Sequence, residues 1–388
     1  MKSTTPLPPR NEARGRKAPA TGTRRGMPKW LKVLLTAILL VAVAIGVYAG
    51  YLFWYANNSL DTISTAPKQE GGGSVDVTET LSPQTEPFAF VILGTDHRED
   101  APGLRSDVVM VGGLHPETKE AVLISLPRDT YTEVEGYRAD KLTHYYPIFH
   151  KLHEEGKLDS ASPEDEMKKM LGTYMGINFD HIAVINFNGF VDLVDAVGGV
   201  NVNVDQNMCY RDSIDGTNIK LKQGEQKLEG KQALDFVRYR KSNCRPMTKG
   251  TTDFDRNKRQ NEVISEIVGN MQSLGGVSHV FSVIDAISKN FKMDMTPDQM
   301  RSSLMTYFDI NRQNIHYISV DGEWRSPYIY VDEQKLADAK QTLQDVLAGK
   351  SLKTAPPASA DPGSSGTPGP NGPTGPKNSN QQMHQKEQ

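Results

Sequence analysis

Apolar positions along the chain fall into three patterns. A continuous apolar stretch without a charged residue covers 33–55. Short apolar runs of four to eight residues, rich in Val, Ile and Leu, occur at 88–93, 107–114 and 120–126. Runs of this length and composition are typical of strands in a buried sheet, and 181–187 and 315–320 have the same character. The third pattern, apolar residues spaced by three and four, predicts amphipathic helices between and after these strands.

Helix signals accompany the third pattern. Segment 163–176 has Ser162 as a candidate N-cap, Pro163 at the first helical position and Gly176 placed to end the helix. Thr296 and Pro297 predict another helix start in the same way. Further helices are expected at 188–199, capped by Asn188, at 228–241, where the helix passes into an extended piece, and at 251–274, 276–289 and 332–349.

The stretch 33–55 predicts a transmembrane anchor. Its 23 residues, at 1.5 Å each, span a hydrocarbon core of about 30 Å. Trp30 precedes it and Trp54 and Tyr55 close it, as interfacial aromatic residues do. A cleaved signal peptide is the alternative, but its apolar region would be shorter, about 7–15 residues, and would end at small residues. The basic segment 1–32 predicts a cytoplasmic N-terminus and places the rest of the chain outside the cell membrane.

The composition of the chain after the predicted anchor indicates a linker, a globular domain and a tail. A polar linker with a GGGS break follows at 56–87, a globular domain is expected at 88–350, and the Pro/Gly/Ser-rich tail 351–388 is expected to be disordered. The net charge is −3, and residues 1–32 carry nine Lys/Arg and one Glu, or +8, so the rest carries −11. An acidic domain argues against a general nucleic-acid binder.

Charged residues gather where the first three apolar runs begin and end. Arginines offer bidentate forks to phosphate oxygens, and carboxylates hold hard cations such as Mg²⁺. Ligands usually bind at the loops beyond the strand ends of α/β proteins. Turn solubility and surface ion pairs are the simpler explanation for any one of these residues. The charged residues are Asp96, Arg98, Arg105, Asp107, Arg128 and Asp129.

The second half of the chain adds candidates of the same kind. Arg238 and Arg240 are two residues apart, so they point the same way only on extended backbone, and a shared direction favours a strand end. In segment 251–274 the apolar stripe of Val263, Ile264, Ile267, Val268 and Met271 continues backwards through Arg256, Arg259 and Gln260. Polar residues on the buried side of the first turns predict a cleft there, with Asp253 nearby.

Cys209 and Cys244 are the two cysteines of the chain. Both follow the predicted anchor and lie outside the membrane, where thiols are not kept reduced, so one disulfide is expected. Two unpaired thiols are the alternative. A bridge would close a loop of about 35 residues and stabilise the fold by roughly 3–4 kcal/mol. It would tie the polar, turn-rich tract 205–228 to the segment that carries Arg238 and Arg240.

Several segments together resemble the LytR-CpsA-Psr family of cell-wall ligases. They are LGTDHR, RSDVV, SLPRDTY, DKL, VINFNGFVDLVDAVGGV, LEGKQALDFVRYRK and DFDRNKRQ. The resemblance covers about 88–320 and the anchor topology. The chain departs from the family pattern at 205–227 and 242–252. The fold implied is a three-layer α-β-α sandwich with a central mixed β-sheet, carried by a single N-terminal transmembrane helix.

The resemblance also implies an activity. Such proteins take an anionic glycopolymer from a polyprenyl-pyrophosphate carrier and attach it to peptidoglycan through a phosphodiester. By matching position, Asp107 and Asp253 would hold Mg²⁺ and Asp96 would be the base. Gln260 would line the head-group site. The pyrophosphate would be bound by Arg98, Arg105, Arg128, Arg238, Arg240 and Arg256.

The lipid tail of such a donor needs an apolar channel, which helix 163–176 and the stripe of 263–271 are candidates to line. Two other functions use the same residues. One is hydrolysis of the carrier pyrophosphate, and the other is non-catalytic binding of polyprenyl phosphates by an envelope regulator. The sequence leaves open which polymer is moved, whether teichoic acid, capsule or another anionic glycan.

Overall fold

The structure is a computed structural model that describes residues 58–66, 85–96, 105–213, 216–273 and 277–352, together with residues 50, 54 and 83. Apart from residues 50 and 54, the basic tail and predicted anchor at 1–55 lie outside this part, as do most of the linker and the tail from 353. No helix among the described residues has the length and apolar character needed to cross a membrane.

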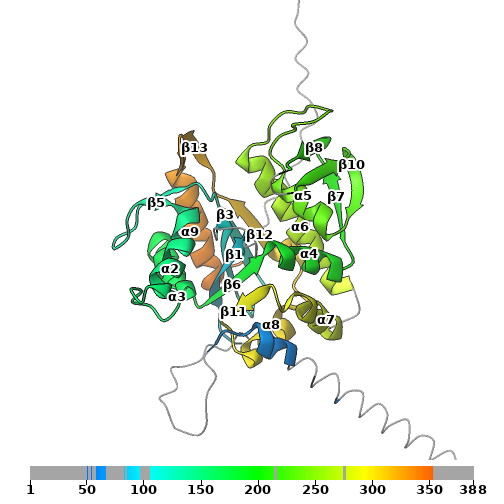
Figure 1. Cartoon of the computed structure of the whole chain (residues 1–388). Coiled ribbons are helices and arrows are strands. Elements are labelled where there is room, and N and C mark those ends of the chain that lie inside the picture. Colours follow the sequence, from blue (N-terminus) through cyan, green and yellow to red (C-terminus); the bar gives the residue numbers. More distant parts are fainter. Residues whose placement is uncertain are drawn as a thin grey trace, which may run out of the picture.

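A six-stranded mixed sheet forms the centre of the domain (Figure 1). Strand β1 runs parallel to β6, and β3 runs parallel to β12, while the other neighbours are antiparallel. Five of these strands are formed by the apolar runs of the sequence as predicted, and β11 was not predicted. In sheet order they are β11 (Phe291–Met293), β6 (His181–Asn186), β1 (Phe88–Thr95), β2 (Ser106–Leu114), β3 (Ala121–Leu126) and β12 (Ile315–Ser319).

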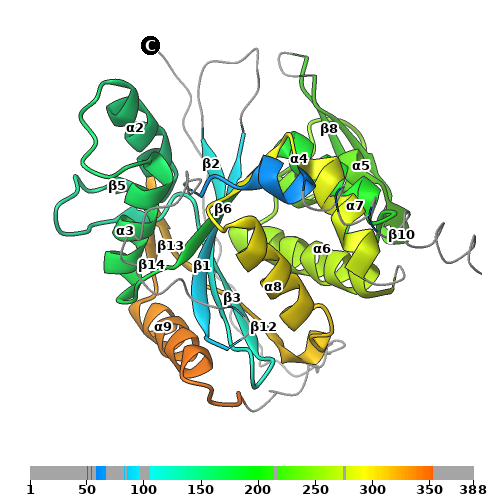
Figure 2. The ribbon, with the colours of Figure 1, turned by 90° about the horizontal axis from the view of Figure 1, so that it is seen from below.

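Helices cover both faces of the sheet, as Figure 2 shows from below. One face packs against α2 (Leu142–Glu154), α3 (Pro163–Met175) and α9 (Glu333–Leu347), and their apolar side chains share one core with the sheet. The opposite side holds α4 (Phe187–Ala196), α5 (Gly230–Arg238), α6 (Asp253–Ser273), α7 (Val277–Ile287) and α8 (Pro297–Tyr307). The three-layer arrangement expected from the resemblance is therefore present.

The start of α3 agrees with its sequence signals, whereas the start of α4 does not. Ser162 accepts a hydrogen bond from the Asp165 N–H, and Gly176 ends α3 in the left-handed conformation, as predicted. The prediction that Asn188 caps the next helix is wrong. Strand β6 passes directly into α4, and the side chain of Asn186 accepts the N–H of Gly189. The cap is thus two residues earlier because no loop separates strand and helix.

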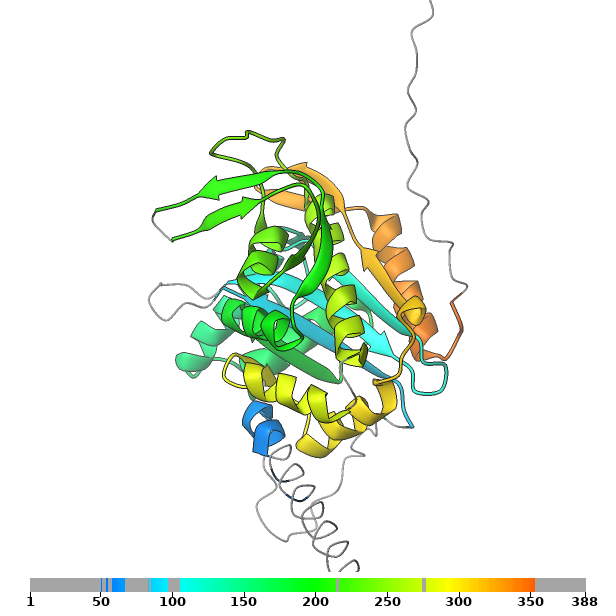
Figure 3. The same cartoon turned by 90° about the vertical axis from the view of Figure 1, so that its right-hand side faces the viewer.

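The polar, turn-rich tract 205–228 contains regular strands. It contributes β8 (Met208–Arg211), β9 (Asn218–Leu221) and β10 (Gly224–Leu228), and β10 pairs with β7 (Val200–Val204). Alternate residues of β7 and β9 are buried against α4, α5 and α6. Figure 3 shows these strands above the helices of this layer. The predicted disulfide between Cys209 and Cys244 is present and joins β8 to the segment after Arg240.

Two short hairpins lie at one end of the sheet. The first is formed by β4 (Tyr131–Thr132) and β5 (Asp140–Lys141), and the second by β13 (Gly322–Arg325) and β14 (Tyr328–Val331). A parallel bridge between Thr130 and Ile329 joins them. The 3-10 turn η1 (Arg312–Asn314) precedes β12.

Candidate active site

The charged residues of the first three strands meet at one edge of the sheet. Strand β2 is antiparallel to both β1 and β3, with Thr95 opposite Ser106 and Leu126 opposite Val109. The end of β1, the start of β2 and the end of β3 therefore lie together. The Asp96 N–H donates to the Arg105 carbonyl at 3.0 Å. The sequence prediction for Arg98 lies outside the described residues.

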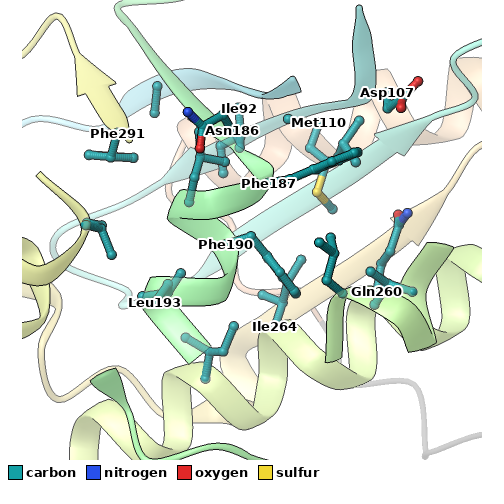
Figure 4. A pocket seen from close by; sticks show the side chains of 18 of the residues that line it. Ile92, Asp107, Met110, Asn186, Phe187, Phe190, Leu193, Gln260, Ile264 and Phe291 are labelled. Carbon is teal, nitrogen blue, oxygen red and sulfur yellow. The ribbon is translucent and has the colours of Figure 1, made fainter. Parts of the chain in front are cut away.

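A cavity of about 750 Å³ opens at this edge and runs between the sheet and the helices α4 to α8. One end is charged, and most of the remaining wall is apolar. Figure 4 shows Asp107 and Gln260 toward one end, with Phe190, Leu193 and Phe291 farther along. Six of the predicted site residues line the cavity, namely Asp107, Arg128, Arg238, Arg240, Arg256 and Gln260.

For three other predicted site residues, the described part of the structure shows no contact with the cavity. Asp96 and Arg105 belong to the same strand edge but do not line the cavity in this structure. Asp253 is the first residue of α6, and its side chain lies outside the described part. The roles proposed for these three residues therefore stay predictions.

Arg238 and Arg240 line the cavity, but the backbone that carries them is not the expected strand end. The prediction of a strand end is wrong because α5 continues to Arg238 and residues 239–252 form no strand; the next residue, Tyr239, has φ −59° and ψ 131°. Arg238 therefore projects from the last helical turn, and Arg240 from the segment that follows. The Arg238 guanidinium lies 4.3 Å from the ring centroid of Phe187, which restricts its position through a cation–π contact.

Helix α6 separates the polar residues that the sequence placed on one stripe. Arg256 and Gln260, four residues apart, line the cavity. Arg259 is buried on another side of the helix, where Nε and Nη2 donate to the carboxylate of Asp205, both at 2.7 Å. Its Nη1 donates to the Tyr239 carbonyl at 3.2 Å. Arg259 thus connects α6 to Asp205 and to the backbone at Tyr239, and it does not line the cavity.

Opposite charges hold the arginine end together. Arg128 donates a hydrogen bond to Asp107, and its Nε lies 3.6 Å from Asp129 Oδ2. Burial lowers the pKa of Arg256 to about 10, and the charges of Arg240 and Arg128 add to this effect. Burial and the charge of Arg128 lower the pKa of Arg240 in the same way. These guanidinium groups are therefore close enough to repel one another, as expected of a site built for an anion.

Lys141, which was not predicted as a site residue from the sequence, belongs to the same end. Its Nζ donates to Asp129 Oδ1 at 2.9 Å, because the short β4–β5 hairpin returns the chain to the strand edge. Burial alone would raise the pKa of Asp129, but the hydrogen bond from Lys141 and the charges of Arg128 and Arg240 hold it below its ordinary value. Asp129 is therefore a carboxylate that orients cations.

The donor set suits Mg²⁺ only in part. Within the described ranges there is no group of three His, Cys, Asp or Glu side chains that could enclose a metal. Mg²⁺ commonly binds one or two protein carboxylates and completes its shell with water and substrate phosphate oxygens. Asp107 fits one such position because its carboxylate lines the cavity beside Arg128.

The apolar wall comes from one of the two predicted segments. Ile264, Ile267 and Val268 of α6 line the cavity, as expected. The prediction for segment 163–176 is wrong, because α3 packs on the other face of the sheet, where Met167, Met170 and Leu171 are fully buried in the core. Strands β1, β2 and β6 supply the facing wall, with residues such as Phe90, Ile92, Met110 and Ile185.

A mixed sheet between two helical layers, with an arginine-lined cavity at the strand edge, agrees with one known family. Residues 51–345 match the model of the LytR_cpsA_psr family, and the chain belongs to this family. Among curated proteins, a polyisoprenyl-teichoic acid–peptidoglycan teichoic acid transferase TagU of Bacillus cereus is 31% identical over 327 residues, covering 81% of this chain and 98% of the relative.

Solved structures show the same fold. TagV of B. subtilis is 24% identical with a TM-score of 0.54, over 68% of this chain and 98% of that protein. A Streptococcus agalactiae protein is 25% identical with a TM-score of 0.57, over 72% of this chain and 93% of that protein.

Proposed function

We propose that this protein transfers an anionic glycopolymer from a polyprenyl-pyrophosphate carrier to peptidoglycan. One observation carries the proposal: a single cavity combines an arginine cluster at one end with a long apolar wall. A polyprenyl pyrophosphate has the matching halves, a doubly charged head and a hydrocarbon tail. The name of the relative from B. cereus supports peptidoglycan as acceptor and teichoic acid as one candidate polymer.

The arginines bind the pyrophosphate in this proposal. Arg128, Arg240 and Arg256 are the charges that influence one another most directly, and Arg238 is positioned by Phe187. Guanidinium forks bind the non-bridging oxygens and stabilise the charge that these oxygens gain during transfer. Gln260 contributes a neutral hydrogen-bonding group to the same end. Arg105 and Arg98, at and beside the strand edge, are the remaining candidates.

Mg²⁺ is the proposed cofactor, held by Asp107 and Asp253 together with phosphate oxygens. When bound, the ion would neutralise phosphate charge at the reacting centre. Asp107 also orients Arg128 through their ion pair, so the carboxylate has a role in positioning whether or not the ion is bound.

The reaction joins a peptidoglycan hydroxyl oxygen to the phosphorus that carries the glycopolymer. The bond from that phosphorus to the bridging oxygen breaks, and polyprenyl monophosphate leaves with the electron pair. Asp96, at the end of β1, is the candidate that accepts the hydroxyl proton. Most of the rate enhancement comes from positioning both substrates and from stabilising the negative charge on the non-bridging phosphate oxygens in the transition state.

The proposed location follows from the substrate. A carrier lipid lies in the membrane, and segment 33–55 would anchor the chain there as a single-pass protein with its N-terminus in the cytoplasm and the catalytic domain outside. The polar segment 56–87 would tether the domain to the bilayer.

Product analysis tests the function. The full chain in lipid vesicles receives a lipid-linked teichoic acid precursor, Mg²⁺ and purified peptidoglycan. Polymer joined to peptidoglycan through a phosphodiester, with release of polyprenyl monophosphate, is expected. Free phosphorylated polymer would instead indicate a hydrolase, and lipid binding without turnover would indicate a regulator. Repeating the assay with capsule-type donors identifies the preferred polymer.

A further inference from the structure

A cluster of aromatic side chains, of which Tyr131 and Tyr328 are half-buried, lies beside the arginine end and has no part in the cavity. Tyr131 of β4 stacks on Tyr330 of β14 with ring centroids 5.3 Å apart, and Tyr328 meets Tyr131 edge-on at 5.2 Å. We call these three residues the tyrosine platform. Tyr330 is 38% exposed, and nearby Trp324 of β13 is 56% exposed. Exposed aromatic groups of this kind usually mark a binding surface.

The platform is built onto the site itself. Tyr328 and Tyr330 lie on one face of β14, and Ile329 between them points the other way. Ile329 is buried and lines a small second cavity together with Asp107, Arg128 and Arg256. Its N–H donates to the Asp129 carbonyl at 2.8 Å. The tyrosine platform is therefore separated from the arginine cluster by the thickness of one strand.

Lys141 provides a second connection. It donates to Asp129 within the arginine end, and its Nζ lies 5.8 Å from the Trp324 ring centroid. Figure 1 shows β5, which carries Lys141, and β13, which carries Trp324, on the same side of the domain. A ligand on the aromatic surface would therefore lie close to a phosphate bound at the arginine end.

Charge indicates the chemistry of this ligand. Glu323 pairs with Arg325, whose guanidinium lies 5.2 Å from the Tyr330 ring centroid. Glu133 accepts a hydrogen bond from the Tyr131 hydroxyl at 3.5 Å. Acidic and basic groups are thus balanced around the platform, unlike the arginine end. A balanced aromatic surface favours the uncharged C–H face of a sugar ring over a polyphosphate chain.

We propose that the tyrosine platform and Trp324 bind the glycan strand of the peptidoglycan acceptor. The inference rests on the proposed function and adds the place where the second substrate binds. Sugar rings stack on Tyr330 and its neighbours, while the strand's hydroxyl reaches the phosphate at the arginine end. The donor's tail occupies the apolar cavity, so the two substrates approach the reacting phosphorus from different sides.

Calorimetry on the full chain in vesicles tests this binding, with soluble peptidoglycan fragments freed of attached polymer as the probe. Tyr330→Ala is expected to weaken fragment binding roughly tenfold, and Tyr330→Phe, which keeps the ring, by less than about twofold. Met305→Ala is the matched control, because Met305 is 59% exposed on α8, away from the platform. Its fragment affinity should equal that of the parent chain.

Two further measurements separate the possible failures. Affinity for polyprenyl pyrophosphate should be the same in Tyr330→Ala and in the parent chain. Unchanged fragment binding by Tyr330→Ala, or tighter binding of free teichoic acid polymer than of fragments, would overturn the platform's role. If the parent binds fragments through Tyr330 but makes no phosphodiester, the proposed transfer is wrong and the glycan site stands.

Discussion

Arg256 lies where burial and neighbouring cations both oppose its charge. Its pKa is lowered to about 10, which still leaves the guanidinium charged at neutral pH. A lysine starts from an ordinary pKa of about 10.4, so the same environment would bring its pKa much closer to neutrality. Arginine is therefore the residue that holds a positive charge here over the whole physiological pH range.

Arg256→Lys is accordingly expected to bind polyprenyl pyrophosphate in a pH-dependent way. A cation with a lowered pKa loses its charge as pH rises through that value, so affinity should fall toward the alkaline end of the range in the variant and stay constant in the parent chain. Equilibrium binding measured from pH 6 to 9 checks this. A flat profile for the lysine variant would show that the site does not suppress its charge.

Asp107→Asn tests the metal. The amide keeps the size of the side chain but loses the charge, so Mg²⁺ affinity in the presence of donor should fall about tenfold or more, while the melting temperature changes little. Asp309→Asn is the control, because Asp309 is an exposed partner of Lys119 at 3.7 Å. Calorimetric titration with Mg²⁺ measures the affinity of each variant. Equal Mg²⁺ affinities in the two variants would show that Asp107 only positions Arg128.

Arg238 tests the requirement for a planar guanidinium. Arg238→Lys is expected to lose nearly as much transfer activity as Arg238→Ala, because lysine lacks the fork that binds two oxygens and stacks well on Phe187. Steady-state rates with saturating donor compare the two. A lysine variant with most of the parent activity would reduce Arg238 to a simple counter-charge.

At the scale of elements, the sequence predicted what depends on local signals. The runs at 88–93, 107–114 and 120–126 became β1, β2 and β3, and the charges between them met because antiparallel pairing returns the chain to one edge. Two kinds of fact were beyond such signals. The sequence does not show on which side of the sheet α3 packs, and it does not show that Arg259 turns away from Arg256 toward Asp205.

The ion pair of Arg259 with Asp205 holds α6 in place, and its two side chains differ in burial. The Arg259 side chain is 3% exposed, whereas that of Asp205 is 47% exposed. Asp205→Ala leaves a buried cation without its carboxylate and is expected to destabilise the domain by about 2–4 kcal/mol. Asp298→Ala, which breaks the exposed pair with Arg301, should cost less than about 0.5 kcal/mol. Urea unfolding compares them, and equal midpoints would contradict a structural role for the buried pair.

The disulfide connects two elements that the chain separates by 35 residues. Cys209 lies in β8, and the next residue of this strand, Tyr210, lines the cavity. Cys244 follows Arg240 by four residues. The double Cys→Ser variant is expected to lose roughly 3–4 kcal/mol of stability and to bind donor more weakly. Unfolding and donor binding measured on both proteins test this. A variant that matches its parent in both would show that packing alone positions the arginine segment.

For the whole molecule, the main consequence of the fold is that one cavity links the arginine end to the layer of α7 and α8. Its wall includes Ile63 from the segment that follows the predicted anchor, Phe291 from the edge strand β11 and Met300 from α8. The cavity therefore runs from the strand edge toward the part of the domain that follows the predicted anchor in the sequence. This route is suited to a tail that remains connected to the bilayer.

The affinity for polyprenyl pyrophosphate should therefore depend on tail length. Each methylene group buried against the wall contributes up to about 0.8 kcal/mol, so affinity should rise with the number of isoprene units and become constant once the 750 Å³ cavity is filled. Ile264→Trp places a larger ring on the α6 wall and should lower the chain length at which affinity becomes constant, without changing the affinity for a head group with a very short tail. Titrations with a series of tail lengths measure both curves. If affinity does not vary with tail length in the parent chain, the tail lies outside the cavity, and the apolar wall serves only as part of the core.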